Sequence, residues 1–305
     1  MDVQALLVTA LWTMTPIAFA AIGEAVSERS GVLNIGLEGM MLTSAFVSIY
    51  VAVKSGNVEL GLFAGIASGA LVAGLNALLV LWTNMDQVVA GLTLNLLALG
   101  GTSVLARQAF TGTENATVPT FGTVDIPVLK DIPFLGPILF EQRLLTYVCV
   151  VIAIVLLWVL TRTTTGLRIQ AAGEDPDAAA LEGVAVRGVR LFSNLTAGLL
   201  AGVGGAFLAL GIVGTFADNM VSGRGFIALA VVIIARWNPL LAIPAAAFFG
   251  FTEAIGIQLQ TSGSSIPFQI FVALPYVATL VVLFTRIGSK AAPRQLGQAW
   301  RVDVR

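Results

Sequence analysis

Residues 166–190 read GLRIQAAGEDPDAAALEGVAVRGVR, and they form the longest polar interruption with helical character in an otherwise apolar sequence. One apolar run ends before this stretch at Leu160, and another begins after it at Leu191. A membrane protein that keeps a charged, alanine-rich segment between two spans exposes that segment to water. The stretch therefore serves either as a docking element for another protein or as an ordinary surface loop.

A short helix is predicted within this stretch. Pro176 suits a first helical turn, because the N–H that proline lacks would have no intrahelical partner there. Acidic residues surround this start, where the helix dipole favours negative charge, namely Glu174, Asp175 and Asp177. Strong helix formers follow, among them Ala178, Ala179 and Leu181. Gly183 is expected to end the helix about two turns after its start.

The composition indicates an integral membrane protein. The chain is 57% hydrophobic and 11% charged, with a mean hydropathy of +0.93, whereas soluble domains carry about 25% charged residues. The net charge of −1 gives no sign of nucleic-acid binding, and the single cysteine, Cys149, excludes a disulfide framework. Because the chain has no histidine, histidine-based metal sites and Ser-His catalysis are excluded.

The apolar runs predict an all-α polytopic fold with about nine membrane spans, in a range of eight to ten. The run at 225–236 is too short to cross alone and suggests half of a broken helix. The first run lacks a positively charged leader, so a retained helix is expected rather than a signal peptide. The expected spans are 4–22, 38–53, 60–82, 87–106, 143–161, 191–214, 225–236, 239–257 and 268–285.

Lysine and arginine set the expected orientation of a single transmembrane domain, residues 1–285. The central loop 162–190 and the basic tail 286–305 are expected in the cytoplasm by the positive-inside rule. An odd number of spans then places the amino terminus outside, together with loop 107–143, which forms either an ordered lid or a plain connector. Tryptophans at the expected cytoplasmic helix ends support this register: Trp82, Trp158 and Trp237.

Glycines recur at every fourth position in two of the expected spans. Small residues with this spacing let helix backbones approach closely in lipid, so a packing role is expected for Gly65, Gly69, Gly198 and Gly202. The segments 61–79 and 195–210 also resemble each other loosely, which hints at the internal duplication common in transporters.

Polar residues at membrane depth are the candidate pathway. Residues 31–39, GVLNIGLEG, would break a helix there, and such backbone survives only inside protein or beside water. Ionisable groups inside spans are functional candidates, but hydrogen bonding between helices is an equally ordinary role for polar ones. The candidates are Asn34, Glu38, Asn76, Asn95 and Glu253, a largely neutral set that suits a polar, uncharged solute.

No catalytic residues are predicted. None of the three lysines follows a glycine, so a phosphate-binding loop for ATP is absent. Two classes of transporter remain, a secondary carrier and the membrane subunit of a pump whose ATPase is another chain. The polar stretch between the spans favours the second class.

Four motifs resemble those of permease subunits of bacterial ABC importers of the branched-chain amino acid and ribose type. The sequence is most similar to the shorter permease of nucleoside importers, from about residue 20 to 285. Residues 171–183, AAGEDPDAAALEG, look like the coupling loop of that family. The other motifs are 31–39, 86–95 (DQVVAGLTLN) and 225–239 (GFIALAVVIIARWNP).

The resemblance implies a type II importer permease in the bacterial inner membrane, without a cofactor or metal of its own. ATP would be bound by a cytoplasmic ATPase, and a second, different permease and an extracytoplasmic substrate-binding protein would complete the importer. The coupling loop would dock on the ATPase through Gly173, Glu174, Asp175, Pro176, Ala178, Ala179, Leu181 and Gly183. The short run 225–236 and Glu253 depart from the family pattern.

Other functions remain open at this point. The solute could be ribose, another sugar or a branched-chain amino acid, because much of the selectivity of such importers lies in the separate binding protein. A proton-coupled secondary carrier using Glu38 or Glu253 is the alternative from another class, and a non-transporting scaffold or membrane enzyme is the third.

Overall fold

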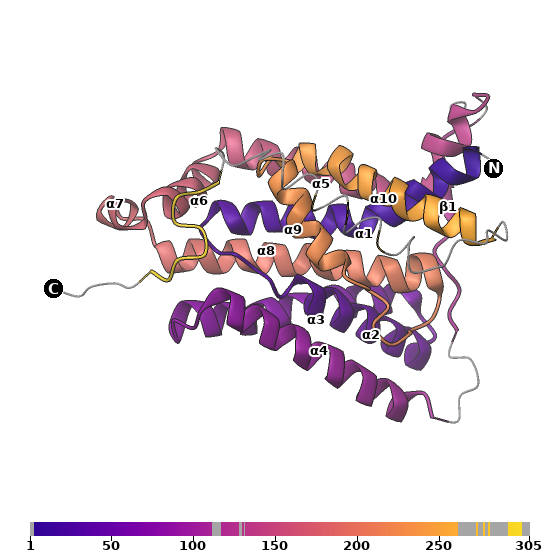
Figure 1. Ribbon diagram of the computed structural model, residues 1–305, viewed down its shortest axis with the longest axis horizontal. Coiled ribbons are helices and arrows are strands. Elements are labelled where there is room, and N and C mark those ends of the chain that lie inside the picture. Colours follow the sequence, from indigo (N-terminus) through magenta and orange to yellow (C-terminus); the bar gives the residue numbers. More distant parts are fainter. Residues whose placement is uncertain are drawn as a thin grey trace.

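Long helices run side by side along the molecule (Figure 1). The computed structural model describes residues 3–111, 117–127, 130, 132–261 and 292–300, with single positions 273, 277 and 280. Its helices are α1 (Val3–Arg29), α2 (Leu37–Ser55), α3 (Val58–Ala77), α4 (Gln87–Ala109), α5 (Leu144–Arg162), α6 (Thr164–Glu174), α7 (Pro176–Leu181), α8 (Val186–Ala206), α9 (Arg224–Ile234) and α10 (Pro239–Thr261). Three π-helical segments are η1 (Leu78–Trp82), η2 (Gly136–Phe140) and η3 (Phe207–Val213).

Seven helices in the described part of the chain are long and apolar enough to cross a membrane. They are α1, α2, α3 with η1, α4, α5, α8 with η3, and α10. The run expected to be half a span is α9, an apolar helix of 11 residues. The ninth expected span, 268–285, lies outside the described residues apart from three isolated positions.

The first helix is longer than its apolar run. It was expected to end at residue 22, but α1 continues to Arg29. Its added turns carry polar residues that are nevertheless buried, among them Glu24, Ser27 and Glu28. Hydropathy alone therefore places the end of this helix too early, since buried partners compensate for the polar side chains.

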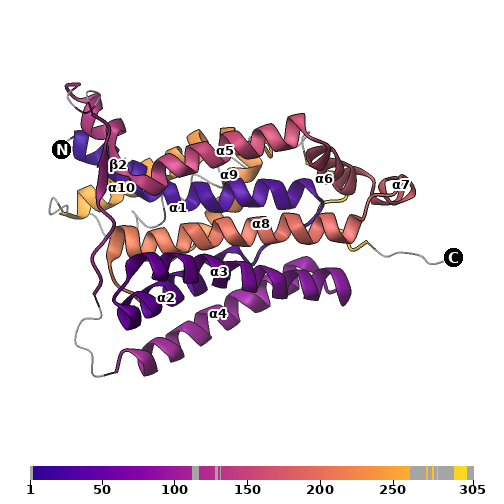
Figure 2. The same cartoon turned by 180° about the vertical axis from the view of Figure 1, so that it is seen from behind.

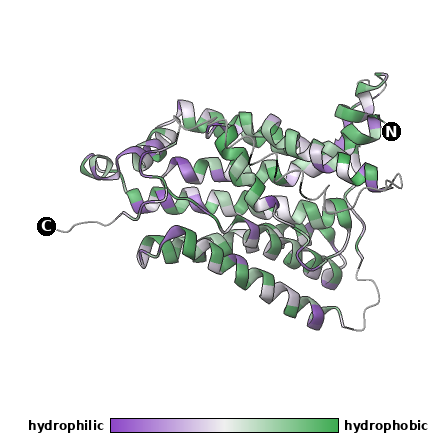
Figure 3. Ribbon diagram, in the orientation of Figure 1, coloured by the Kyte–Doolittle hydropathy of each residue, from purple (hydrophilic) through white to green (hydrophobic). Residues whose placement is uncertain are grey.

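The two ends of the bundle differ in structure. At one end lies the amino terminus with a two-stranded antiparallel sheet, in which β1 (Thr123–Asp125) pairs with β2 (Glu141–Arg143) (Figure 2). At the other end lie α6, α7 and residues 292–300 (Figure 1). The ribbon around α6 is more hydrophilic than the middle of the bundle (Figure 3). This separation fits the expected cytoplasmic and external ends, and the orientation itself stays a prediction.

Central and peripheral helices are buried to very different degrees. α8 has the largest buried share of the seven long helices, and α1 is buried almost continuously from Thr13 to Glu28. α4 and α5 lie at the edges (Figure 2) and expose mainly leucine, valine and isoleucine. An apolar outer face of this kind suits contact with lipid or with another membrane subunit.

The glycines spaced by four lie where α3 meets α8. A Cβ atom at Gly69 would lie 2.6 Å from the carbonyl oxygen of Gly198 and 2.7 Å from the Cα of Gly202. Gly65 faces Ser44 of α2 in the same way, with a Cβ placed 2.9 Å from its Oγ. The two segments that resemble each other in sequence therefore pack against one another at backbone distance.

Two interruptions of the helical path shape the interior. After α1 the chain turns at 30–36, with Gly31 at φ +91°, before α2 starts. After η3 the segment 214–223 leads back to α9. The first interruption is shorter than the expected 31–39, because residues 37–39 already belong to α2.

Candidate functional site

Three asparagines from three parts of the chain meet in the interior. The Nδ2 of Asn34 donates to the Oδ1 of Asn194 at 3.0 Å. The Nδ2 of Asn76 donates to the Oδ1 atoms of Asn34 and Asn194 at 3.3 Å and 3.4 Å. All three side chains are fully buried. We call these residues the asparagine cluster; Asn194 is a member that the sequence analysis did not identify.

A buried carboxylate holds the turn that carries Asn34. The backbone N–H of Asn34 donates to the Oε1 of Glu24 at 2.8 Å, and the N–H of Gly36 donates to the Oδ1 of Asn34 at 3.0 Å. Glu24 is fully buried in α1. Sequence reasoning missed it because it lies beyond the expected end of the first span. The signal was its spacing of four from Glu28, which places both carboxylates on one helix face.

Glu28 explains the position of Trp237. The indole Nε1 of Trp237 donates to the Oε2 of Glu28, and the tryptophan is 3% exposed. The ring of Trp237 therefore faces protein rather than lipid or water, whereas Trp82 and Trp158 are exposed, and its depth at the membrane interface stays a prediction. A buried indole needs an acceptor for its N–H, and here α1 supplies it.

α4 supports the same turn from the other side. The Oδ1 of Asn95 accepts from the N–H of Gly39 at 2.8 Å, and its Nδ2 donates to the carbonyl of Ile35 at 2.9 Å. The Oε1 of Gln87 accepts from the N–H of Leu33 at 2.7 Å. Asn34, Asn76 and Asn95 thus all make the interhelical or backbone hydrogen bonds of the alternative role, and their place in a pathway stays a prediction.

Glu38 connects the starts of α2 and α9, the helices that follow the two interruptions. Its Oε1 and Oε2 accept from the N–H groups of Gly223 and Gly225 at 2.7 Å and 2.8 Å. A carboxylate at the start of α9 satisfies otherwise unpaired N–H groups and is favoured by the helix dipole. A Cβ at Gly225 would lie 2.5 Å from the backbone nitrogen of Glu38, so only glycine fits this contact.

Glu253 pairs with Arg224, the first residue of α9. The Nη1 of Arg224 also donates to the carbonyls of Met220 and Val221, at 3.0 Å and 2.9 Å. The two charged side chains are 15% and 20% exposed, so this ion pair is partly accessible. Among the described residues, Glu253 makes no hydrogen bond to the asparagine cluster.

The polar stretch between the spans folds as two successive short helices, α6 and α7, which we call the coupling hairpin. Asp175 precedes α7 and accepts from the N–H of Ala178 at 3.0 Å, Pro176 is its first residue, and Gly183 follows it at φ +82°. The predicted helix therefore begins and ends as its local signals indicate. Leu181 at its tip is 89% exposed.

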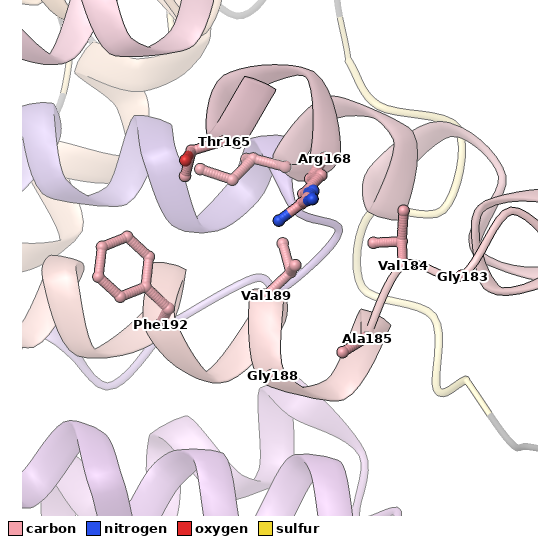
Figure 4. A pocket seen from close by; sticks show the side chains of 9 residues that line it. Thr165, Arg168, Gly183, Val184, Ala185, Gly188, Val189 and Phe192 are labelled. Carbon is pink, nitrogen blue, oxygen red and sulfur yellow. The ribbon is translucent and has the colours of Figure 1, made fainter. Parts of the chain in front are cut away.

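The hairpin carries recesses beside this exposed leucine. One, of about 310 Å³, lies between α6 and the start of α8, where Arg168 faces Val189 and Phe192 (Figure 4). A second, of about 480 Å³, follows α6 and α7 and is lined mainly by apolar atoms, with Leu167, Ala171 and Val184 among its walls. A protruding apolar side chain next to an apolar recess is typical of a docking surface.

Comparison with known proteins places the chain among transport permeases. A family model described as "Branched-chain amino acid transport system / permease component" matches residues 6–283. The chain is similar to the guanosine ABC transporter permease protein NupQ of Bacillus subtilis (strain 168), at 36% identity over 293 residues, 92% of each chain.

Two further relatives differ in the solute that their names give. The nucleoside ABC transporter permease protein NupC of Lactococcus lactis subsp. cremoris (strain MG1363) is 35% identical over 93% of this chain and 92% of its own. The putative glucose ABC transporter permease protein TsgC13 of Haloferax volcanii is 35% identical over 81% of this chain and 75% of its own.

Proposed function

The chain belongs to the branched-chain amino acid transport system permease family, and on that premise we propose that it is the membrane-spanning permease of an ABC importer for nucleosides. The observation that carries the solute class is the similarity to two permeases named for guanosine and nucleosides, at 35–36% identity over more than nine tenths of both chains. The amide groups of the asparagine cluster support the same class, because nucleosides are uncharged and rich in hydrogen-bonding groups.

The coupling hairpin is the proposed contact with a cytoplasmic ATPase. Its protruding Leu181 and the apolar recess along α6 and α7 suit insertion into a groove of another protein. ATP would be bound and hydrolysed by that partner, so the permease itself needs no cofactor. This arrangement puts the hairpin end in the cytoplasm and the amino terminus outside.

The proposed pathway lies around the two interruptions. α2 and α9 start next to each other inside the bundle and are joined by Glu38, and helices broken in this way form solute sites in other transporters. Asn34, Asn76, Asn95 and Glu253 would lie near the path. A second, different permease and an extracytoplasmic binding protein would complete it.

Uptake measurements test this proposal directly. The chain is expressed with its neighbouring ATPase, second permease and binding protein, and uptake of labelled guanosine, adenosine and glucose is followed in energised vesicles. ATP-dependent nucleoside uptake that needs all four parts is expected. Glucose uptake without nucleoside uptake would favour the sugar alternative, which the Haloferax volcanii relative supports.

A charge introduced at the tip of the coupling hairpin tests the contact with the ATPase without disturbing the fold. Leu181→Asp should abolish uptake while the chain remains in the membrane at its usual level, because a buried charge at an apolar contact is unfavourable. Arg187→Gln, a change at an exposed position of α8, is the matched control. Uptake by the chain alone that stops when the proton gradient is collapsed would instead establish the secondary carrier.

A further inference from the structure

Arg190 is one of the basic residues of the central loop 162–190 on which the expected orientation rests, and it is only 1% exposed. Among the described residues its guanidinium forms no ion pair. It donates instead to three carbonyls: Nε to Ser30 at 3.1 Å, Nη2 to Ala172 at 3.2 Å and Nη1 to Gln298 at 3.3 Å. A buried cation is tolerated only when such hydrogen bonds replace its water.

Each of the three carbonyls belongs to a different segment. Ser30 opens the turn that follows α1, Ala172 lies in the last turn of α6, and Gln298 lies in the segment 292–300. The last carbonyls of a helix lack intrahelical partners, and the helix dipole favours a cation beside them. The guanidinium is therefore satisfied only while the turn, the coupling hairpin and the carboxy-terminal segment are together.

The segment 292–300 makes the same connection through its backbone. The N–H of Gln295 donates to the carbonyl of Gly173 at 2.9 Å, and the N–H of Gly297 donates to the carbonyl of Gly31 at 3.1 Å. In Figure 1 this yellow segment lies along α6 and the end of α1. The described part of the expected basic tail is thus packed against the bundle.

Side chains of the same segment reach α7. The indole Nε1 of Trp300 donates to the Oδ1 of Asp177 at 2.8 Å, and its ring packs beside a buried cluster that includes Ala172 and Ala179. The pair of Arg294 and Glu174, at 3.7 Å, is exposed on both sides and contributes little. The tryptophan is therefore the main side-chain contact of the segment with the coupling hairpin.

We propose that Arg190 and residues 292–300 form a clamp that holds the coupling hairpin and the turn 30–36 together as one unit during transport. The turn also carries Asn34, whose Oδ1 accepts from the N–H of Gly36, the residue before α2. A displacement of α6 and α7 by the ATPase is thereby passed to α2 and the asparagine cluster. Arg190 and Trp300 are positioning residues in this scheme, which rests on the proposed importer function.

The first experiment compares uptake with ATP hydrolysis in the complete importer with its loaded binding protein. Arg190→Gln should lower the solute carried per ATP about tenfold, because hydrogen bonds to a charged group are lost, while hydrolysis continues. Arg190→Lys keeps the charge but reaches fewer carbonyls, so an intermediate ratio is expected. Arg187→Gln, exposed one turn earlier on α8, should leave the ratio unchanged.

Trp300→Ala is a second test of the clamp, and it leaves the interior of the bundle intact. Its control is Trp158→Ala, on the exposed face of α5. Trp300→Ala should lower the same ratio, by less than Arg190→Gln. Unchanged solute per ATP in both Arg190→Gln and Trp300→Ala would overturn the clamp.

Cross-linking tests whether the segment 292–300 lies against α7, and it does not depend on solute transport. The native Cys149 is buried, so a bis-maleimide can selectively link Asp177→Cys to Trp300→Cys across the space that the tryptophan side chain fills. A high yield that falls when Arg190→Gln is added is expected, and the cross-link should restore the uptake that Trp300→Cys lowers. Loss of uptake on cross-linking would show that the segment must leave the hairpin and would overturn the proposal. Failure of the unmodified importer to carry any solute would instead count against the proposed function.

Discussion

The two interruptions of the helical path are built in opposite ways. The turn 30–36 is held by side chains from α1, α4 and α8, and its polar groups are buried. The segment 214–223 has short-range backbone bonds, such as those from Met220 to Ala217 and from Ser222 to Asn219, and its residues 217–219 are exposed. Its end is held by a side chain distant in sequence, through the bond from Gly223 to Glu38. Regions with few buried contacts open most easily.

This difference assigns them different parts in movement. In the proposed scheme the turn 30–36 joins the coupling hairpin to α2 and transmits displacement, while the segment 214–223, with several exposed residues, is the part expected to change shape when displacement arrives. Glu38 is where the two meet, since it belongs to α2 and holds the start of α9. Substitutions should therefore have their largest effects at the first interruption and progressively smaller ones toward the second.

Asn34→Ala should cause the largest loss. It removes the bonds to Asn194 and Gly36 and leaves buried donors unpaired, so the free energy of unfolding should fall by about 3 kcal/mol. Thermal unfolding in detergent measures this change. Asn57→Ala, which removes an exposed cap of α3, should cost only about 1 kcal/mol. Equal losses would mean that the turn is no better anchored than an ordinary helix end.

Gly225→Ala tests the contact between the starts of α2 and α9. The added methyl group would lie 2.5 Å from the nitrogen of Glu38, so the helices must separate at a cost of about 2 kcal/mol. Gly100→Ala is the control, because nothing lies within 4 Å of its Cβ position. A stable, active Gly225→Ala importer would show that the two starts are not pressed together.

Glu38→Gln should have a smaller effect. The amide keeps one acceptor for α9 but loses the charge that its dipole favours, worth about 1 kcal/mol. The initial rate of solute uptake should fall, whereas Glu59→Gln in the exposed first turn of α3 should leave it unchanged. An unaltered rate for Glu38→Gln would show that the charge of Glu38 is not needed to hold the starts of α2 and α9 together.

Glu253→Gln should have the smallest effect of the series. The amide of glutamine keeps an oxygen acceptor for Arg224, and Arg224 also keeps its bonds to the carbonyls of Met220 and Val221, so only the negative charge of the pair is lost. The Glu253→Gln importer should therefore take up solute at close to the unmodified rate. Complete loss of uptake would make Glu253 an obligatory proton site and revive the secondary carrier.

Local signals explain what could be predicted from the sequence. Pro176, Asp175 and Gly183 mark the ends of α7 within a few residues, and the long apolar runs mark the spans. Only part of the asparagine cluster could be predicted. Asn76 stands out in an apolar run, but its partner Asn194 is recognised only once α3 and α8 are packed together. Arg190 could not be assigned, since its acceptors are backbone carbonyls that residue types do not reveal.

The separation of Asn34 from Asn194, 160 residues along the chain, also has a consequence for synthesis. At about 5–20 residues per second a ribosome needs roughly 8–32 seconds to make that distance. During this time Asn34 and Asn76 have been made while Asn194 of α8 has not, so the asparagine cluster stays incomplete. Glu28 waits longer still, because its partner Trp237 lies 209 residues further along the chain. The interior polar contacts can therefore close only after most of the helices have been inserted.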